Sequence, residues 1–178
     1  GICIALHATG AGEAHIGIKR KFHGPVQRLA DALTELLEAG WPYADRITID
    51  TGPDAYLFGE ETGMLRVIEG DLPLPHVTRP FEEGLFATTV DPRPTVVNNV
   101  ETLAHVTRIL AEGPEWFRQA GTESSPGTML FTVVGDVDNQ GTYELALGTR
   151  LRTLLVDIAG ARDIKVVAPG TSSTLITP

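Results

Sequence analysis

The chain has 178 residues, of which 42% are hydrophobic and 21% are charged, and its formal net charge is −9. This length holds one or two domains with an adequate core, and no apolar run approaches the ~20 residues of a membrane-spanning helix. The acidic balance disfavours a nucleic-acid-binding or anionic-membrane surface, so we expect no nucleic-acid partner and no direct membrane insertion. The single cysteine, Cys3, excludes an internal disulfide and an all-cysteine metal cage within this sequence.

The first residues, with the sequence GICIAL, lack a basic leader and a small-residue cleavage site. We interpret them as a chain that begins within a domain and not as a signal peptide. The expected location is therefore cytoplasmic, either soluble or peripheral to a membrane complex.

The first third of the chain alternates between strand and helix patterns. Residues 4–9 predict the end of a helix, and residues 14–18 alternate in polarity as a strand does. Residues 25–37 place apolar side chains at three- and four-residue spacing, which predicts a helix, and residues 46–50 predict the next strand. This order predicts a parallel pair of strands with a right-handed crossover.

Few polar residues of this region have a spacing typical of a catalytic, metal-binding or anion-binding site. The basic triplet at residues 19–21 is either a solvated strand end or an anion contact. His7, His15 and His23 lack carboxylate or cysteine neighbours at metal-ligand spacing, so we interpret them as surface or loop residues. Asp50 belongs to no acid–base pair that the sequence can identify.

The next stretch, residues 52–65 (GPDAYLFGEETGML), predicts a tight corner that leads into a helix. Glu60 and Glu61 suit a first helical turn, because acidic side chains complement the helix dipole there, and Gly59 permits a close backbone approach. Corners of this kind bind nucleotides in α/β sheets. A purely structural turn has the same pattern, so the corner leaves both interpretations open.

A proline-rich connector, residues 69–94, separates this corner from the next helix, and long ordered loops are often functional. Residues 100–110 predict that helix, with Asn99 as its cap. Residues 115–117 predict a short helical turn. The side expected to face inward comprises Val100, Leu103, Ala104, Val106, Thr107 and Leu110.

A polar, turn-forming segment at residues 121–127 predicts a domain boundary. Beyond it, residues 128–134 and 142–147 predict two strands, residues 151–159 a helix, and residues 164–167 a third strand. Strands that flank a crossing helix in this order are typical of a β-grasp domain.

Two motifs, YLFGEET at residues 56–62 and TVVNNVETL at residues 95–103, together resemble the FMN- and NADH-binding flavoprotein subunit of NADH:quinone oxidoreductase. The same module occurs in the diaphorase subunit of NAD-linked hydrogenases and in NAD-dependent formate dehydrogenases. Residues 131–144 also resemble the soluble-ligand-binding β-grasp (SLBB) domain that follows the flavin domain in this family. The resemblance implies an α/β fold: the second half of a Rossmann-like flavin-binding domain (residues 1–121), followed by a small ubiquitin-like β-grasp domain (residues 122–178).

The resemblance assigns cofactor contacts to the first motif. It implies that Tyr56, Gly59 and Glu60 contact FMN. It also implies that Glu61 lies near the adenosine ribose of NADH, where a carboxylate accepts hydrogen bonds from ribose hydroxyls and repels a 2′-phosphate.

The resemblance also assigns roles to the second motif and to the connector. Val97, Asn98 and Asn99 are expected to hold the phosphate and ribityl end of FMN through amide donors and acceptors. Phe81 matches an aromatic residue that stacks near the nicotinamide or the adenine. The family's four-iron–four-sulfur cluster has no cysteine ligands in this chain.

Some departures from the family pattern are visible. The Gly-Arg-Gly-Gly loop, which carries most flavin contacts in the family, has no counterpart here. Asp54 stands close to the expected flavin phosphate, where its charge is mildly repulsive. A basic residue expected before the Pro-Phe element falls on Thr78, although the adjacent Arg79 could replace it.

Two functional hypotheses follow. In the first, the chain is a fragment or truncated relative of the flavoprotein subunit, in which NADH passes hydride to FMN and electrons continue to iron–sulfur partner subunits. In the second, it is a non-catalytic scaffold whose β-grasp domain binds a small ligand or another subunit. Because the glycine-rich loop is missing, we expect this chain alone to bind FMN weakly or not at all and to be inactive.

Overall fold

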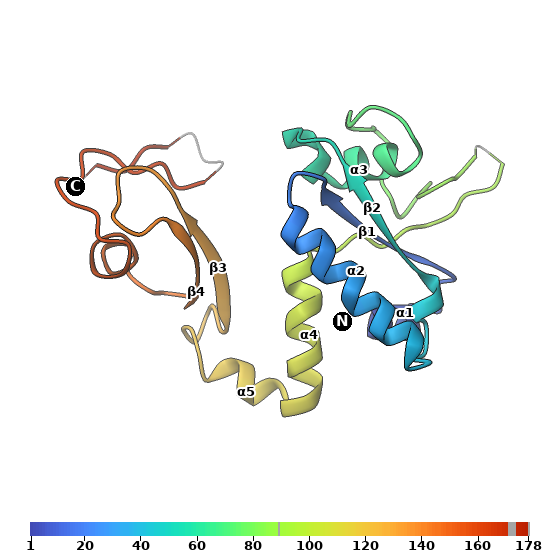
Figure 1. The fold of residues 1–178 in the computed structure, drawn as a ribbon, viewed down its shortest axis with the longest axis horizontal. Helices are drawn as coiled ribbons and strands as arrows, with labels where there is room; N and C mark the ends of the chain where they lie inside the picture. Colours follow the sequence, from blue (N-terminus) through green and yellow to red (C-terminus); the bar gives the residue numbers. More distant parts are fainter. Residues whose placement is uncertain (89, 171–173, 178) are drawn as a thin grey trace. The chain divides into compact units, whose positions relative to one another are not determined.

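The computed structural model describes residues 1–88, 90–170 and 174–177. The chain forms two compact units, Gly1–Thr107 and Arg108–Pro178, and the division falls inside helix α4, Val100–Glu112 (Figure 1). The boundary that the sequence predicts, between residues 121 and 122, lies further along the chain and stays a prediction. Among the described residues, no helix is both long and apolar enough to span a membrane.

The first unit is built on a parallel pair of strands, β1 (Ala14–Lys19) and β2 (Ile47–Gly52). Helix α2 (His23–Glu38) connects them, which confirms the strand–helix–strand order predicted from the sequence. In the register, Ala14 pairs with Ile47 and Lys19 pairs with Gly52, so the carboxyl ends of both strands lie at the same edge. Residues that follow these two ends are therefore gathered in one place.

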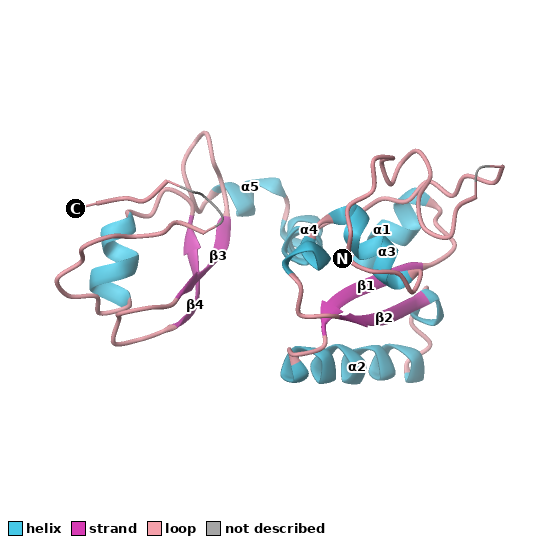
Figure 2. Ribbon diagram, turned by 90° about the horizontal axis from the view of Figure 1, so that it is seen from above, coloured by secondary structure: helices cyan, strands magenta, loops and turns pink. Residues whose placement is uncertain are grey.

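Helices cover both faces of this sheet, with α2 on one face and α3 (Glu61–Ile68) on the other (Figure 2). Two glycines allow the close approach of the second layer. A Cβ atom at Gly17 would lie 2.5 Å from the sulfur of Met64, and one at Gly52 would lie 2.3 Å from the ring of Phe58. Gly17 on β1 therefore lies at the contact with α3, and Gly52 on β2 lies at the contact with the 3-10 helix η2, Tyr56–Gly59, which precedes α3.

The remaining elements of the first unit are short. Helix α1 (Ile2–Thr9) ends at Gly10, whose φ of 71° gives the left-handed C-cap. The 3-10 helix η1 (Ala44–Arg46) precedes β2. The predicted inner side of α4 is wrong in part, because Val100 and Leu110 are 67% and 65% exposed. Leu103 and Val106 are half-buried, as predicted, and Ile109, which the prediction did not include, continues their three-residue spacing.

The second unit contains α5 (Pro114–Arg118), an antiparallel pair, β3 (Thr128–Val133) and β4 (Gly141–Ala146), and the π-helix η3 (Thr153–Ile158). Its core is a cluster of Val133, Leu154 and Ala159. The strand predicted at residues 164–167 is wrong, since these residues form only a single bridge, between Val167 and Ile176. Asp163, just before these residues, has a φ of 49°, in the left-handed region.

Candidate functional site

Glu60 directly precedes helix α3, and its carboxylate caps the helix. Its Oε2 accepts hydrogen bonds from the backbone N–H of Gly63 at 2.7 Å and from the hydroxyl of Thr62 at 2.6 Å. Burial works to raise the pKa of Glu60, but these hydrogen bonds and the nearby charge of Arg79 together hold its pKa below the ordinary value. One first-turn N–H of α3 is thus already satisfied within the protein, a purely structural role that the corner motif also permits.

The capping group is tied to the connector. The buried hydroxyl of Thr62 accepts a hydrogen bond from the backbone N–H of His76 at 2.8 Å. Gly63 permits the close approach of α3 to η2, because a Cβ atom there would lie 2.4 Å from the carbonyl oxygen of Leu57. Gly63 and the hydrogen-bonded side chains of Glu60 and Thr62 therefore fix the geometry of the turn.

Glu61 is paired with the residue that could replace the family's basic group. Its Oε1 lies 3.7 Å from a guanidinium nitrogen of Arg79, and both side chains are largely exposed. Arg79 also lines a cavity of about 100 Å³ between α3 and the connector, together with residues that include Thr62 and Glu83. Sites for drug-sized ligands measure roughly 300–1,000 Å³, so this cavity is too small to enclose a flavin.

The aromatic residues of the predicted site face solvent. Tyr56, at the start of η2, is 74% exposed, and Phe81, in a turn of the connector, is 67% exposed. Gly59, at the end of η2, is also exposed, and a Cβ atom there would meet no neighbour within 4 Å. Two aromatic rings outside the core are available for stacking on a flat ligand.

The second motif forms the start of α4. Asn99 caps the helix, since its Oδ1 accepts a hydrogen bond from the backbone N–H of Glu101 at 2.8 Å, which confirms the predicted cap. Asn98 is exposed and Val97 is half-buried. Asn98 is thus accessible to solvent, while Oδ1 of Asn99 is occupied by the hydrogen bond that caps α4.

Arg79 connects the two motifs to each other. Its guanidinium faces Glu61, and the next residue, Pro80, accepts a hydrogen bond through its carbonyl from the backbone N–H of Thr95 at 2.8 Å. Thr95 is the first residue of the TVVNNVETL motif. A short path of contacts within the first unit therefore joins the turn at Glu60 and Glu61 to the irregular segment that leads to Asn98.

The basic triplet meets the acidic residue of the corner. The ammonium nitrogens of Lys21 and Lys19 lie 2.7 Å and 3.8 Å from Oδ1 of Asp54. The hydrogen bond from Lys21 is the main reason that the pKa of Asp54 is lowered. The repulsion that the sequence predicts between Asp54 and a phosphate is thus offset by two neighbouring positive charges.

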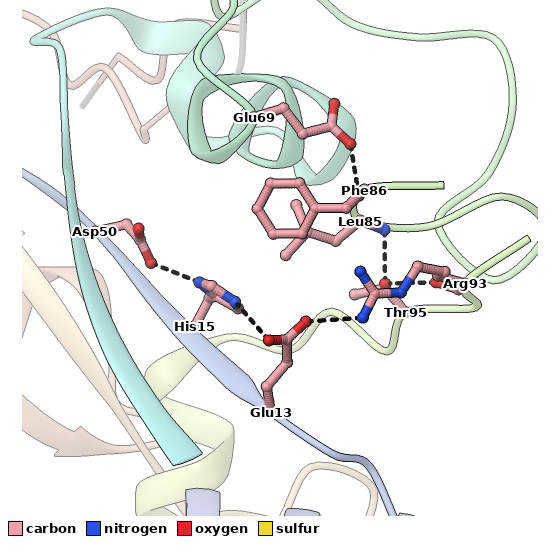
Figure 3. Close-up of polar contacts among 8 residues, drawn as sticks. All are labelled: Glu13, His15, Asp50, Glu69, Leu85, Phe86, Arg93 and Thr95. Atoms are coloured by element: carbon pink, nitrogen blue, oxygen red, sulfur yellow. Dashed lines mark hydrogen bonds and ion pairs between the residues drawn. The ribbon is translucent and has the colours of Figure 1, made fainter. Parts of the chain in front are cut away.

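The sequence interpretation missed one polar cluster. The prediction that His15 is a surface or loop residue is wrong, because it lies in β1, is 16% exposed and contacts Asp50 on β2 (Figure 3). The parallel register brings the two together although they are 35 positions apart. The spacing of His15 and Asp50 along the sequence could not reveal this pair. The sequence did place His15 in a strand, through the alternating polarity of residues 14–18. His7 and His23 are exposed, as predicted.

Comparisons with known proteins agree with these motifs. A family model described as "Nuo51 FMN-binding domain" matches residues 1–108. An NADH-quinone oxidoreductase subunit of Rhizobium meliloti is 36% identical, with 100% of this chain and 44% of that protein covered. An NADH-quinone oxidoreductase subunit of Streptomyces coelicolor is 38% identical, with coverages of 98% and 40%.

Solved structures also include similar chains. The crystal structure of an NAD⁺-reducing [NiFe]-hydrogenase in the H₂-reduced state contains a chain with a TM-score of 0.82 and 34% identity. The match covers 98% of this chain and 30% of that chain. The chain thus spans less than half the length of each of these relatives. Because the family model accounts for more than half of its residues, the chain belongs to the Nuo51 FMN-binding domain family.

Proposed function

We propose that the chain forms one wall of a site for FMN and NADH in an NADH dehydrogenase-type flavoprotein. The observation that supports this most directly is the path from Glu61 through Arg79 and Pro80 to Thr95, which joins both motifs within one unit. The cavity beside this path is small, so this chain supplies part of the binding surface and not all of it.

The residues present fit part of such a site. The exposed rings of Tyr56 and Phe81 suit stacking on flat π-systems. The amide of Asn98 suits the ribityl hydroxyls and phosphate of FMN, with Val97 and the capping residue Asn99 holding the backbone there. Glu60 and Gly59 shape the turn that faces the flavin, and Glu61 with Arg79 faces the ribose of NADH.

When bound, FMN supplies the redox chemistry, namely acceptance of hydride from NADH and onward delivery of electrons. The side chains of the protein bind FMN and NADH and orient the two molecules. We extend the proposal to the setting of the whole protein: the electrons continue to iron–sulfur partner subunits, and the location is cytoplasmic.

The second unit carries an observation that favours the other hypothesis. A largely apolar groove of about 400 Å³ lies between η3 and the segment that follows it, lined by residues that include Leu155, Ile164 and Ile176. This volume is within the range of small-ligand sites. We propose a β-grasp (SLBB) identity for this unit, and a non-catalytic role in binding a ligand or subunit as the second candidate function.

A flavin titration distinguishes the two candidates. The purified chain, and the protein encoded by the longest reading frame that contains it, are titrated with FMN while flavin fluorescence is followed. We expect weak or no quenching with the chain alone and tight quenching with a longer protein that includes a glycine-rich loop.

Two variants calibrate the titration. Asn98→Ala should weaken binding by the longer protein about tenfold, as loss of a polar contact to the ligand predicts. Gln119→Ala, which removes an exposed amide at the end of α5, is the control. Tight stoichiometric quenching by the chain alone would contradict the one-wall proposal, and no binding by a longer protein with that loop would favour the second candidate.

A further inference from the structure

A chain of polar contacts runs from the middle of the parallel sheet to the connector (Figure 3). On β2, Oδ2 of Asp50 lies 2.8 Å from Nδ1 of His15 on β1. The other ring nitrogen of His15, Nε2, lies 4.0 Å from Oε2 of Glu13, and Oε1 of Glu13 lies 3.3 Å from a guanidinium nitrogen of Arg93. The family motifs include none of these four residues.

The connector adds an apolar contact to the same histidine. The ring of Phe86 meets the ring of His15 edge-on, with centroids 6.1 Å apart and planes at 67°. The backbone of Phe86 has a φ of 57°, a left-handed conformation that is strained for a residue with a bulky side chain. Its N–H donates to Oε1 of Glu69 at 2.8 Å, and the neighbouring Leu85 is buried. A strained backbone that is held in place by surrounding contacts marks this point as an anchor.

The connector behind this anchor is cross-linked to itself. The N–H of Arg93 donates to the carbonyl of Glu83 at 2.7 Å, and the N–H of Leu85 donates to the hydroxyl of Thr95 at 2.8 Å. With the Thr95–Pro80 hydrogen bond, these contacts join residues 80–85 to residues 93–95 as one body. A displacement at Phe86 or Arg93 is therefore passed on to both ends of that body.

Those two ends adjoin residues of the proposed site. Phe81 follows Pro80 directly, and Asn98 lies three positions after Thr95. We propose that His15 is a positioning residue: held by Asp50, it fixes the connector on the sheet and thereby sets where Phe81 and the Asn98–Asn99 turn lie. The part of this inference that concerns cofactor contacts rests on the proposed function, whereas the anchoring does not.

Burial explains why a histidine suits this position. Nε2 of His15 is buried and makes no hydrogen bond among the described residues, because Oε2 of Glu13 at 4.0 Å is beyond hydrogen-bond distance. The bond from Nδ1 to Asp50 therefore orients the ring. An apolar ring would fill the space against Phe86 but would leave the carboxylate of Asp50, itself 25% exposed, without this partner. The ring contact and the hydrogen bond can thus be removed separately.

The experiment removes each contact in turn and measures amide hydrogen exchange of residues 80–95. His15→Phe keeps a ring and removes the bond to Asp50, while His15→Asn keeps a donor and removes the ring. Arg93→Gln breaks the exposed end of the chain of contacts and leaves the buried pair intact, so it remains informative if a His15 variant fails to fold. His23→Asn, at the exposed start of α2, is the control.

We expect exchange of the hydrogen-bonded amides of Leu85, Phe86, Arg93 and Thr95 to quicken about tenfold or more in His15→Phe, because a hydrogen bond to a charged group is lost. Arg93→Gln should change the same amides in the same direction, less strongly, and α2 should be unaffected in both variants. Unchanged exchange in the connector, or equal acceleration in α2 and the connector, would overturn the inference.

A second readout separates the inference from the proposed function. In a longer protein that binds FMN, His15→Phe should raise the Kd for FMN several-fold, and Asp50→Asn, which keeps an acceptor for His15, should raise it less. If that protein binds no FMN, the proposed function fails, while the exchange measurement still decides the anchoring role. If FMN binds equally well to both variants although the connector exchanges faster, the positioning of site residues is refuted.

Discussion

At the scale of single residues, Glu60 combines a structural task with a predicted place in the site. Its carboxylate caps α3 and is held in the charged form by its hydrogen bonds, so its pKa is lowered. A lowered pKa means that its contribution to stability is present above the unfolded-state value, about 4.3 for glutamate, and is lost as the pH falls through the folded-state value below it.

Replacement of this cap should show that pH dependence. Glu60→Gln should lower the free energy of unfolding at pH 7 by about 1 kcal/mol or less, because Gln retains an acceptor for Gly63. The difference from the wild type should shrink as the pH falls from 5 to 3. Urea unfolding across this range measures it, with Glu35→Gln on the exposed side of α2 as the control for loss of one acidic charge. A difference that is constant with pH would exclude the charged cap.

Glu61 and Arg79 lead to a prediction about nucleotide choice. Arg79 offsets the charge that Glu61 would present to a 2′-phosphate, so the two residues act in opposite directions. In a longer protein with a complete site, Glu61→Gln should improve the use of NADPH relative to NADH, and Arg79→Gln should impair it. Steady-state rates with both nucleotides measure the ratio, and an unchanged ratio in both variants would rule out this pair as the selector.

At the scale of elements, the glycines of the strands determine how closely α3 and η2 approach the sheet. Gly52→Ala would place a methyl group against the ring of Phe58, and such overpacking costs about 1–3 kcal/mol. Gly24→Ala, in α2, meets open space and should stabilise by up to ~1 kcal/mol, since glycine is a poor helix former. Chemical unfolding of the two variants compares them. Equal effects would mean that the contact between Phe58 and the sheet is not tight.

At the scale of the whole molecule, the chain consists of two units with separate cores. Each unit has one tryptophan, Trp41 in the first and Trp116 in the second, which gives each its own fluorescent probe. Leu154→Ala, in the core of the second unit, should destabilise that unit by about 2–5 kcal/mol.

This prediction can be measured in single-tryptophan variants. In Trp41→Phe, the signal from Trp116 should show the loss caused by Leu154→Ala. In Trp116→Phe, the signal from Trp41 should be unaffected by Leu154→Ala and should respond to Leu65→Ala, which removes a buried side chain of the first unit. A single transition that shifts equally for both probes would show that the two units unfold together.

Local elements and the family resemblance could be predicted from the amino-acid sequence. Helix periodicity, the acidic start of α3, the cap at Asn99 and the two motifs are encoded by neighbours within a few positions, so they can be predicted without a fold. The predicted strand at residues 164–167 failed because strand formation depends on a partner strand, and here the partner contributes one bridge.

Tertiary structure alone decided which distant residues meet. The pair of His15 and Asp50 exists because two parallel strands lie in one register, and the neutralisation of Asp54 exists because the ends of those strands share an edge. Likewise, the contact between Glu61 and Arg79 depends on how the connector folds back over α3. Such contacts follow from packing between segments that are far apart in the chain, and no spacing within the sequence records them.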